Sequence, residues 1–398
     1  MLLRATQLIS PSNAAEGKLG SIELNLRLAH LVGLPLLGLK NETRIERILV
    51  TLNGALILFG LYLYVIFEIY DLSLNFQDLD KVTQNLVMTL THSAYLLKTI
   101  NIWYHYGSLK DIMSRLKVIT RACVLSAKQV ETFHKAEMEG KLVLLLYFLL
   151  VLVSGTLGLV SILTFPGDFE GSRFPYSAKL PNFLSPLIKH LYMGLSVAIL
   201  ALAVSQIDCL TVLIMNQICM HLKVLNLAFE ELYAPSDQKL KVDPYNWLLS
   251  IVKYHCELIE LRQKVELIFK MPVLLQFVSS LVIVAMTAFQ VIVGDGSKSS
   301  ILMDFLLCCV LCQLFVYCWF GNEVYEQSKT LSTSGFGCSW HDFDGKCKKL
   351  LLIFMINADR PFLFTAGGFM GLTLPSFTYI MGKSYSIVAV LRQMYSRS

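Results

Sequence analysis

The stretch Leu142–Phe165 reads LVLLLYFLLVLVSGTLGLVSILTF, and it contains no Asp, Glu, Lys or Arg. About 20 consecutive apolar residues are enough for an α-helix to cross the hydrocarbon core of a bilayer. Lipid offers no hydrogen-bond partners to backbone N–H and C=O groups, so such a run crosses as a helix. The run is too long, and alternates too little, for a strand of a membrane barrel. We therefore predict a transmembrane helix here.

Five further runs free of charged residues have a similar length, and a weaker seventh run contains Gln84, Asn85 and His92 and ends before Lys98. The chain has 398 residues, of which 55% are hydrophobic and 16% charged, whereas soluble domains carry about 25% charged residues. This composition excludes a soluble enzyme, a disordered regulator and a secreted disulfide scaffold. We predict an all-α integral membrane protein with seven transmembrane helices, at Ile48–Phe67, Val82–Leu97, Leu142–Phe165, Leu191–Ile207, Met271–Val293, Phe305–Asn322 and Pro361–Gly382.

Basic residues are distributed unequally between the two sides of these spans. The segments on one side hold 25 of the 34 Lys and Arg residues, and the alternate loops hold five. Because Lys and Arg accumulate in the cytosol, we predict a cytoplasmic N-terminus and an extracellular C-terminus, the reverse of a G-protein-coupled receptor. The net charge of +5 is explained by these inner segments, so we expect no nucleic-acid partner. The basic segments are 1–47, 107–141, 221–270 and 321–364, and the alternate loops are 69–81, 165–190 and 294–304.

The basic segments carry helical patterning. Residues 221–270 repeat apolar residues at three- and four-residue spacing, with breaks at Pro235 and Pro244, so the fourth and fifth spans are expected to continue into the cytosol as helices. The run Cys347–Ile356 is too short to span, and we interpret it as a buried cytosolic helix that either packs between subunits or covers its own chain. The chain is divided into a cytoplasmic N-terminal segment (1–47), helices 1–6 with an outer ligand pocket and cytosolic helical extensions (48–344), a cytosolic packing or assembly helix (345–360) and a pore-lining seventh helix (361–398).

No catalytic or metal-binding constellation is evident in the sequence. The eight His residues show no His-x-His, His-x-x-His or His-Glu-x-x-His spacing, and there is no Walker loop or Gly-x-Ser-x-Gly elbow. We therefore expect no enzymatic activity, no cofactor and no metal. Glu68 and Asp208 are expected to reach headgroups or water at the span ends, and Lys98 to extend toward the interface. An ion-coupled transporter then lacks its usual ligands, whereas a channel or a receptor does not need them.

The last fifth of the chain contains an ordered set of short motifs. They are Phe320-Gly321-Asn322-Glu323-Val324, Ser328, Trp340, Arg360-Pro361, Thr365-Ala366-Gly367-Gly368-Phe369, Phe377-Thr378, Lys383-Ser384-Tyr385-Ser386 and Leu391. Together with the length and the span layout, this set resembles the insect odorant receptors.

The resemblance implies an odorant-gated, non-selective cation channel that is a heterotetramer of tuning and co-receptor subunits in membrane lipid. It also implies a small volatile odorant bound between the spans in the outer half of the membrane, and a central pore lined by the seventh helices. The implied location is the plasma membrane of an olfactory sensory neuron dendrite. The co-receptor is longer, so this chain is expected to be a tuning subunit. The alternatives left open are a secondary transporter and a non-channel seven-helix receptor.

In the seventh helix, the resemblance places a hydrophobic constriction at Val390 and the next polar position at Gln393. A ring of apolar side chains blocks ions by dewetting, and Ile387, three residues earlier, is expected near the same face. Arg392 departs from this pattern because a ring of Arg repels cations, so we expect it to turn toward headgroups or a neighbouring subunit. Without the resemblance, ordinary helix packing explains Val390 and Ile387.

A volatile ligand needs apolar and aromatic walls with few polar groups. We expect this site on the outer halves of the middle spans, where His92 is the clearest polar group among apolar neighbours. Core packing is the alternative for each residue chosen. The candidates are His92, Tyr95, Ser154, Gly158, Tyr192, Met193, Ser196, Phe289, Met303 and Leu306.

Overall fold

The computed structural model describes residues 19–32, 34, 44–75, 79–122, 126–164, 178–181, 185–233, 243–293 and 299–395. Within these ranges the chain is almost entirely helical. Its elements are α1 (Gly20–Leu31), α2 (Arg44–Leu74), α3 (Leu79–Tyr104), α4 (Tyr106–Ala122), α5 (Ala127–Thr164), α6 (Pro186–Tyr233), α7 (Pro244–Val293), α8 (Ser299–Phe336), η3 (Trp340–Asp342), α9 (Gly345–Ala358), β1 (Thr365–Ala366), β2 (Met370–Gly371) and α10 (Leu374–Tyr395).

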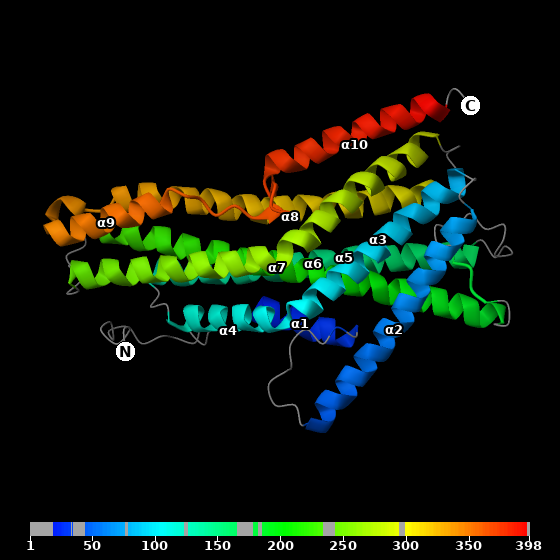
Figure 1. Cartoon of the computed structure of the whole chain (residues 1–398), viewed down its shortest axis with the longest axis horizontal. Coiled ribbons are helices and arrows are strands. Elements are labelled where there is room, and N and C mark those ends of the chain that lie inside the picture. The colour runs from blue at the N-terminus through cyan, green and yellow to red at the C-terminus, as the bar shows by residue number, and fades with distance from the viewer. Residues whose placement is uncertain are drawn as a thin grey trace.

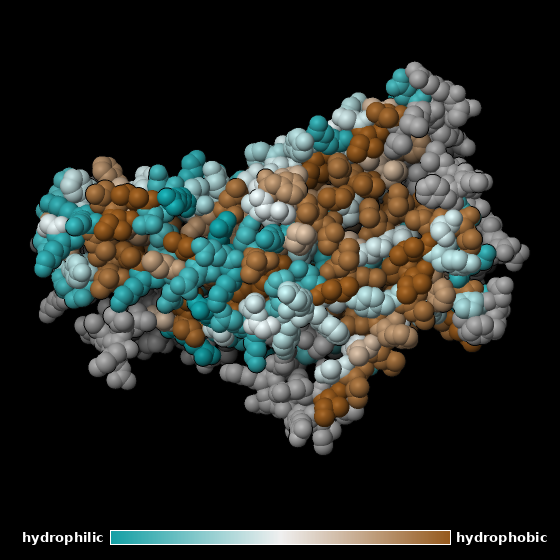
Figure 2. All heavy atoms as spheres, viewed as in Figure 1, coloured by the Kyte–Doolittle hydropathy of each residue, from teal (hydrophilic) through white to brown (hydrophobic). Residues whose placement is uncertain are grey.

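The molecule is an elongated bundle with two different ends (Figure 1). The long helices α5, α6 and α8 and the first part of α7 run along its longest axis, whereas the second part of α7 slants toward α10, and α2 and α3 cross the bundle obliquely. Helix α9 lies against α8 at one end, while α10 diverges from the bundle toward the other end. Figure 2 shows hydrophobic side chains gathered over the half that holds α3 and α10, and hydrophilic side chains over much of the opposite half. This division matches a membrane half and a cytosolic half.

Five of the described helices are long and apolar enough to cross a membrane. Helices α3 and α10, with 26 and 22 residues, are also long enough to cross a hydrocarbon core of about 30 Å at about 1.5 Å per residue. The seven together confirm the predicted all-α membrane fold. The five apolar segments are Thr51–Leu74, Ala127–Leu157, Leu191–Glu231, Pro244–Phe289 and Asp304–Phe336.

The fourth and fifth spans continue far beyond the membrane, as the sequence predicted. Helix α6 has 48 residues and α7 has 50, which corresponds to roughly 70–75 Å of helix at about 1.5 Å per residue. Helix α7 begins at Pro244, a residue whose fixed φ and missing N–H suit the first helical position. Pro235 lies outside the described residues.

Helix α9 covers the run Cys347–Ile356, for which the sequence predicts a short helix. Asp344 caps its N-terminus by accepting a hydrogen bond from the Cys347 backbone N–H at 2.8 Å, and hydrogen bonding by Cys347 holds the pKa of the Asp344 carboxyl below its usual value. Phe354 is buried, and its ring centroid lies 5.1 Å from that of Phe229 on α6. The opposite face exposes Leu352, Ile353 and Ile356.

The predicted start of the seventh span, Pro361, is wrong. The helix begins at Leu374, and the preceding apolar residues form a hairpin in which Thr365–Ala366 pairs antiparallel with Met370–Gly371. Gly367 and Gly368 adopt φ values of 65° and 88°, a region that favours glycine. Hydropathy alone does not reveal this turn, because the hairpin residues are as apolar as those of a transmembrane helix.

Candidate functional site

His92 lies at the centre of a polar and aromatic cluster contributed by α2, α3 and α6. Its Nδ1 lies 2.8 Å from a carboxylate oxygen of Glu68 on α2, and both side chains are buried. The Tyr64 ring of α2 lies 6.1 Å from the His92 ring and 6.0 Å from the ring of Tyr192 on α6. Tyr192 is fixed by its hydroxyl, which donates to the carbonyl oxygen of Gly60 at 2.6 Å. We call Glu68, His92, Tyr64 and Tyr192 the His92 cluster.

Three further predicted ligand residues lie on the same helices, and all three are buried. They are Tyr95 on α3 and Met193 and Ser196 on α6. Tyr95 is fully buried. The predicted ligand set was drawn from the middle spans and contains no residue of α2, so it lacks Glu68 and Tyr64. The signal that could have identified the pair is the presence of one carboxylate, Glu68, at the end of one span and one histidine, His92, in the next.

The other predicted ligand residues fall in different places. The Ser154 hydroxyl of α5 lies 3.9 Å from the Cys309 Sγ of α8, on the same helix as the partly buried Leu306. Phe289 is buried near the outer end of α7. The environments of Gly158 and Met303 lie outside the described part of the structure. The structure therefore unites part of the predicted set around His92 and places Ser154 and Leu306 along α5 and α8.

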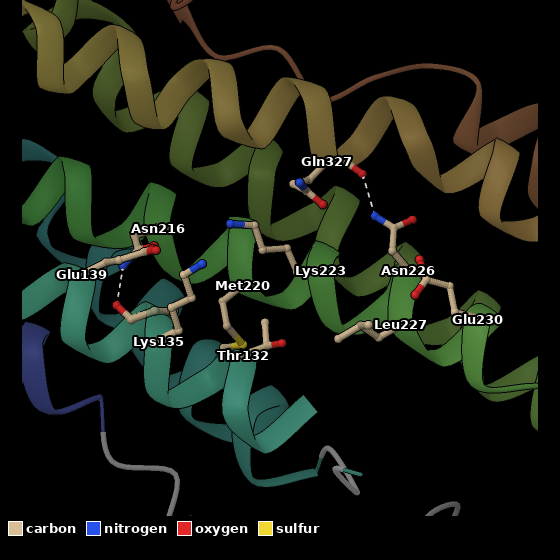
Figure 3. A pocket seen from close by; sticks show the side chains of 11 residues that line it. Thr132, Lys135, Glu139, Asn216, Met220, Lys223, Asn226, Leu227, Glu230 and Gln327 are labelled. Carbon is tan, nitrogen blue, oxygen red and sulfur yellow. Dashed lines mark hydrogen bonds between the residues drawn. The ribbon is translucent and has the colours of Figure 1, made fainter. Parts of the chain in front are cut away.

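A cavity of about 290 Å³ lies elsewhere, in the cytosolic half between α5, α6 and α8. Figure 3 shows polar side chains of both charges around it, including Lys135 and Glu139 of α5 and Lys223 of α6. Lys223 pairs with Glu323 of α8 at 3.4 Å, so its charge is already compensated. This cavity is polar and far along α6 from Tyr192, and it lacks the apolar walls that a volatile ligand needs.

The expected surroundings of Lys98, Asp208 and Glu68 are wrong. Lys98 does not extend toward the interface, because its Nζ donates to Asp208 Oδ1 at 2.7 Å and both side chains are almost completely buried. Glu68 is likewise buried and paired with His92. A buried charge is costly unless a partner compensates it, and each partner here comes from another helix. The environments of these three residues therefore depend on contacts between helices, which a hydropathy profile cannot show.

Helix α10 presents one face to the bundle and the other away from it. Ile380, Ser384 and Val388, spaced by four residues, are buried, and Ser384 donates to the Leu281 carbonyl of α7 at 3.4 Å. Val390 is 57% exposed and Gln393 is also exposed. The third predicted gate residue, Ile387, and the flanking Arg392 are half-buried and exposed, respectively.

The hairpin before α10 is anchored to one face of α7. Arg262 donates to the Leu363 carbonyl, Glu266 accepts hydrogen bonds from the backbone N–H and the hydroxyl of Thr365, and the Lys270 carbonyl accepts from the Gly367 N–H at 2.8 Å. Residues four apart lie on one helix face, so these three form a single docking strip. Sequence reasoning missed them because an amphipathic cytosolic helix also explains their spacing.

Two of the motif residues in α8 hold the same hairpin from the other side. The Ser328 hydroxyl accepts a hydrogen bond from the Phe362 backbone N–H at 2.8 Å. Gly321 lies so close to Leu372 that a Cβ atom added at Gly321 would be 2.5 Å from its backbone oxygen. Ser328 and Gly321 therefore contact the segment that leads into α10.

These features define a multi-pass helical membrane protein in which seven of the described helices are long enough to span, and in which the last packs on α7 and α8 with one face and leaves the other exposed. A model of the family described as 7tm Odorant receptor matches residues 78–385. The chain therefore belongs to the insect odorant receptor family, which is a receptor family and not an enzyme family.

Individual relatives agree with this assignment. The chain is 27% identical over 188 residues to Odorant receptor 85c of Drosophila melanogaster, which is 47% of this chain and 48% of that one. It is 26% identical over 149 residues to Odorant receptor Or2 of Anopheles gambiae, covering 37% and 39% of the two chains. The matched region thus spans about half the length of these relatives or less.

The fold is also that of a solved receptor. The olfactory receptor OR5 from Machilis hrabei in complex with eugenol superimposes with a TM-score of 0.82, over 94% of this chain and 97% of that chain. The sequence identity is 17%, so this likeness concerns the fold.

Proposed function

We propose that this chain is the tuning subunit of an odorant-gated, non-selective cation channel in the plasma membrane of olfactory sensory neuron dendrites. It binds a small volatile odorant in the outer half of the membrane and opens a central pore together with a co-receptor subunit, in a heterotetramer. The observation that carries the proposal is the orientation of α10, which turns Val390 and Gln393 away from its own bundle. Family membership supplies the second support.

The exposed face of α10 suits a pore wall. Val390 provides an apolar constriction that excludes ions by dewetting when four copies approach, and Gln393 lies three residues further along the same side. Arg392 is two residues beyond Val390, which is about 200° of rotation in an α-helix. This rotation directs Arg392 away from the axis, and Ile387, which is half-buried, lines the edge of the constriction.

The outward face of α9 suits an assembly surface. Leu352 and Ile356 are 57% and 60% exposed, and Figure 2 shows hydrophobic side chains at that end of the molecule among hydrophilic ones. Contiguous apolar surface in contact with water usually marks a protein–protein interface. Residues 345–360 therefore form the packing surface toward neighbouring subunits, and residues 361–398 carry the pore helix.

The His92 cluster is the polar part of the proposed odorant site. An apolar ligand with one hydrogen-bonding group would pack against Tyr64 and Tyr192 and use the Glu68–His92 pair as its polar anchor. Binding can shift the gate only if the odorant binds the open conformation more tightly than the closed one.

Electrical recording tests this proposal. We expect a panel of alcohols, esters, aldehydes and phenols, eugenol among them, to evoke cation currents from the chain co-expressed with a co-receptor. Substituting Gln393→Glu is expected to raise Ca²⁺ permeability relative to Na⁺ at least twofold, because four carboxylates would line the pore. Arg392→Gln serves as the control and is expected to leave this ratio unchanged.

Two outcomes would contradict the proposal. If Gln393→Glu and Val390→Ala leave the ion selectivity of the odorant-evoked current unchanged, α10 does not line the pore. Accumulation of labelled odorant in the cell without any evoked current would support secondary transport instead.

A further inference from the structure

Asp208 of α6 lies at the centre of a buried polar cluster that joins four helices. Its Oδ1 accepts hydrogen bonds from Lys98 Nζ of α3 at 2.7 Å and from the Tyr317 hydroxyl of α8 at 2.8 Å. Gln313 of α8 donates to Oδ2. Gln276 of α7 completes the cluster, because its carbonyl accepts from Lys98 and its amide donates to Gln313 at 2.9 Å. We call these five residues the Asp208 centre.

The Asp208 centre is satisfied only while the four helices keep this arrangement. The Lys98 and Asp208 side chains are 1% and 0% exposed, so water cannot replace a lost partner. A buried charge without its partner is far less favourable than the intact pair. Movement of α3, α6, α7 or α8 away from the others would therefore strand a charge or an amide. The centre fixes α7 relative to the other three helices.

Helix α10 packs on α7. Gln276 of the centre donates to the Ser280 hydroxyl at 3.2 Å, one turn further along α7. The next residue, Leu281, offers its carbonyl to Ser384 of α10, and Val388 is buried one turn after Ser384. Leu281 lies five positions after Gln276, which is less than two helical turns. A displacement at the centre thus reaches the α10 contact through one short, continuous piece of helix.

On its other side the Asp208 centre adjoins the proposed odorant site. Lys98 follows Tyr95 by three residues on α3, so the two side chains are neighbours on one helix face. His92 lies one turn before Tyr95. The centre is therefore connected to the His92 cluster through α3 and to the helix that carries Val390 through α7.

We propose that Lys98 and Asp208 are positioning residues for α10. By holding α7 against α3 and α6, they maintain the packing of α10 on α7, and they transmit rearrangement of the His92 cluster to it. The role of α10 in a pore rests on the proposed function, whereas the control of its packing does not.

The first part of the test compares single and double substitutions of the full-length chain. Lys98→Met and Asp208→Leu each leave a buried group without its charged partner, so each is expected to lower the amount at the cell surface at least tenfold. The double variant K98M/D208L removes both charges, and apolar replacement of a buried ion pair is often neutral or stabilising. Tyr317 and Gln313 still lose their acceptor, so the surface level of the double variant is expected to exceed that of either single variant without reaching the wild-type level. Normal levels for both single variants, or a double variant no better than either, would overturn the inference.

The second part measures the packing of α10 without any odorant or current. Val388→Cys is introduced into the wild-type and K98M/D208L chains, and its modification by a membrane-impermeant methanethiosulfonate added outside intact cells is timed. The rate at this buried position is expected to rise at least fivefold in the double variant. The chain without the added cysteine gives the background from the native thiols.

Two matched variants isolate the effect. Val390→Cys, on the exposed face, is expected to react at a rate within twofold in both backgrounds. The exposed pair Asp111–Lys264, which joins α4 to α7, gives the charge-removal control D111N/K264M, with no change expected at Val388→Cys. Equal rates at Val388→Cys in the wild-type and double-variant chains would show that the centre holds the bundle together without positioning α10. Because no current is recorded, failure of the channel proposal would not produce this result.

Discussion

His92 shows how one residue acquires a specific environment. Replacing it with Phe keeps the aromatic volume but leaves the buried Glu68 carboxylate without its 2.8 Å partner. We expect the odorant concentration for half-maximal current to rise at least tenfold, measured with whichever panel compound gives the largest wild-type response and corrected for surface level. Thr156→Ala, at an exposed position of α5, is expected to shift it less than twofold. Similar shifts for both variants would place the odorant elsewhere.

Gly321 is a residue at which a single methyl group matters. A Cβ atom there would lie 2.5 Å from the backbone oxygen and the Cβ of Leu372, so Gly321→Ala forces α8 and the hairpin apart. Overpacking of this kind costs about 1–3 kcal/mol, and we expect a lower unfolding temperature in detergent. Gly155→Ala is the matched control, because nothing lies within 4 Å of its added Cβ. Equal melting temperatures for the two variants would contradict the close approach.

At the scale of elements, the hairpin and α10 depend on the docking strip of α7. Glu266→Ala removes the acceptor for two donors of Thr365, and a hydrogen bond to a charged group contributes about 1.5–3 kcal/mol. Glu260→Ala removes an ion pair to Arg115 in which the Glu260 side chain is 61% exposed, and such pairs contribute about 0–1 kcal/mol. We expect Glu266→Ala to lower the unfolding temperature clearly more than Glu260→Ala. The reverse order would show that the hairpin is held by other contacts.

The elements also show why the sequence predicted some features better than others. The span near Leu142–Phe165 and the long helices α6 and α7 follow from local hydropathy and from proline at their ends, so they were predicted correctly. The start of α10 was not, because the glycine turn at Gly367 sits inside an apolar run. The grouping of the proposed ligand residues also depends on tertiary contacts: the Ser154 hydroxyl lies 3.9 Å from the Cys309 Sγ of α8, and no local pattern in the sequence reveals that neighbour.

For the whole molecule, the predicted orientation has a direct chemical test. Asn41-Glu42-Thr43 is an acceptor sequence for N-glycosylation that lies on the predicted inner side. We expect it to stay unmodified in cells, whereas an acceptor sequence appended after Ser398 is expected to be glycosylated. Glycosidase digestion followed by electrophoresis distinguishes the two. A mass shift from Asn41 in the unaltered chain would invert the topology.

The sequence by itself determined the class of fold, the number of spans, their orientation and the family resemblance. These depend on local hydropathy, on the distribution of charge and on short motifs, all of which are written along the chain. Only the tertiary structure decided that Lys98 meets Asp208, that Glu68 meets His92 and that α10 turns Val390 away from the bundle. The physical reason is that partners for buried charges come from helices far apart in the chain. The residue pattern within one helix does not show which residue of another helix it will pair with.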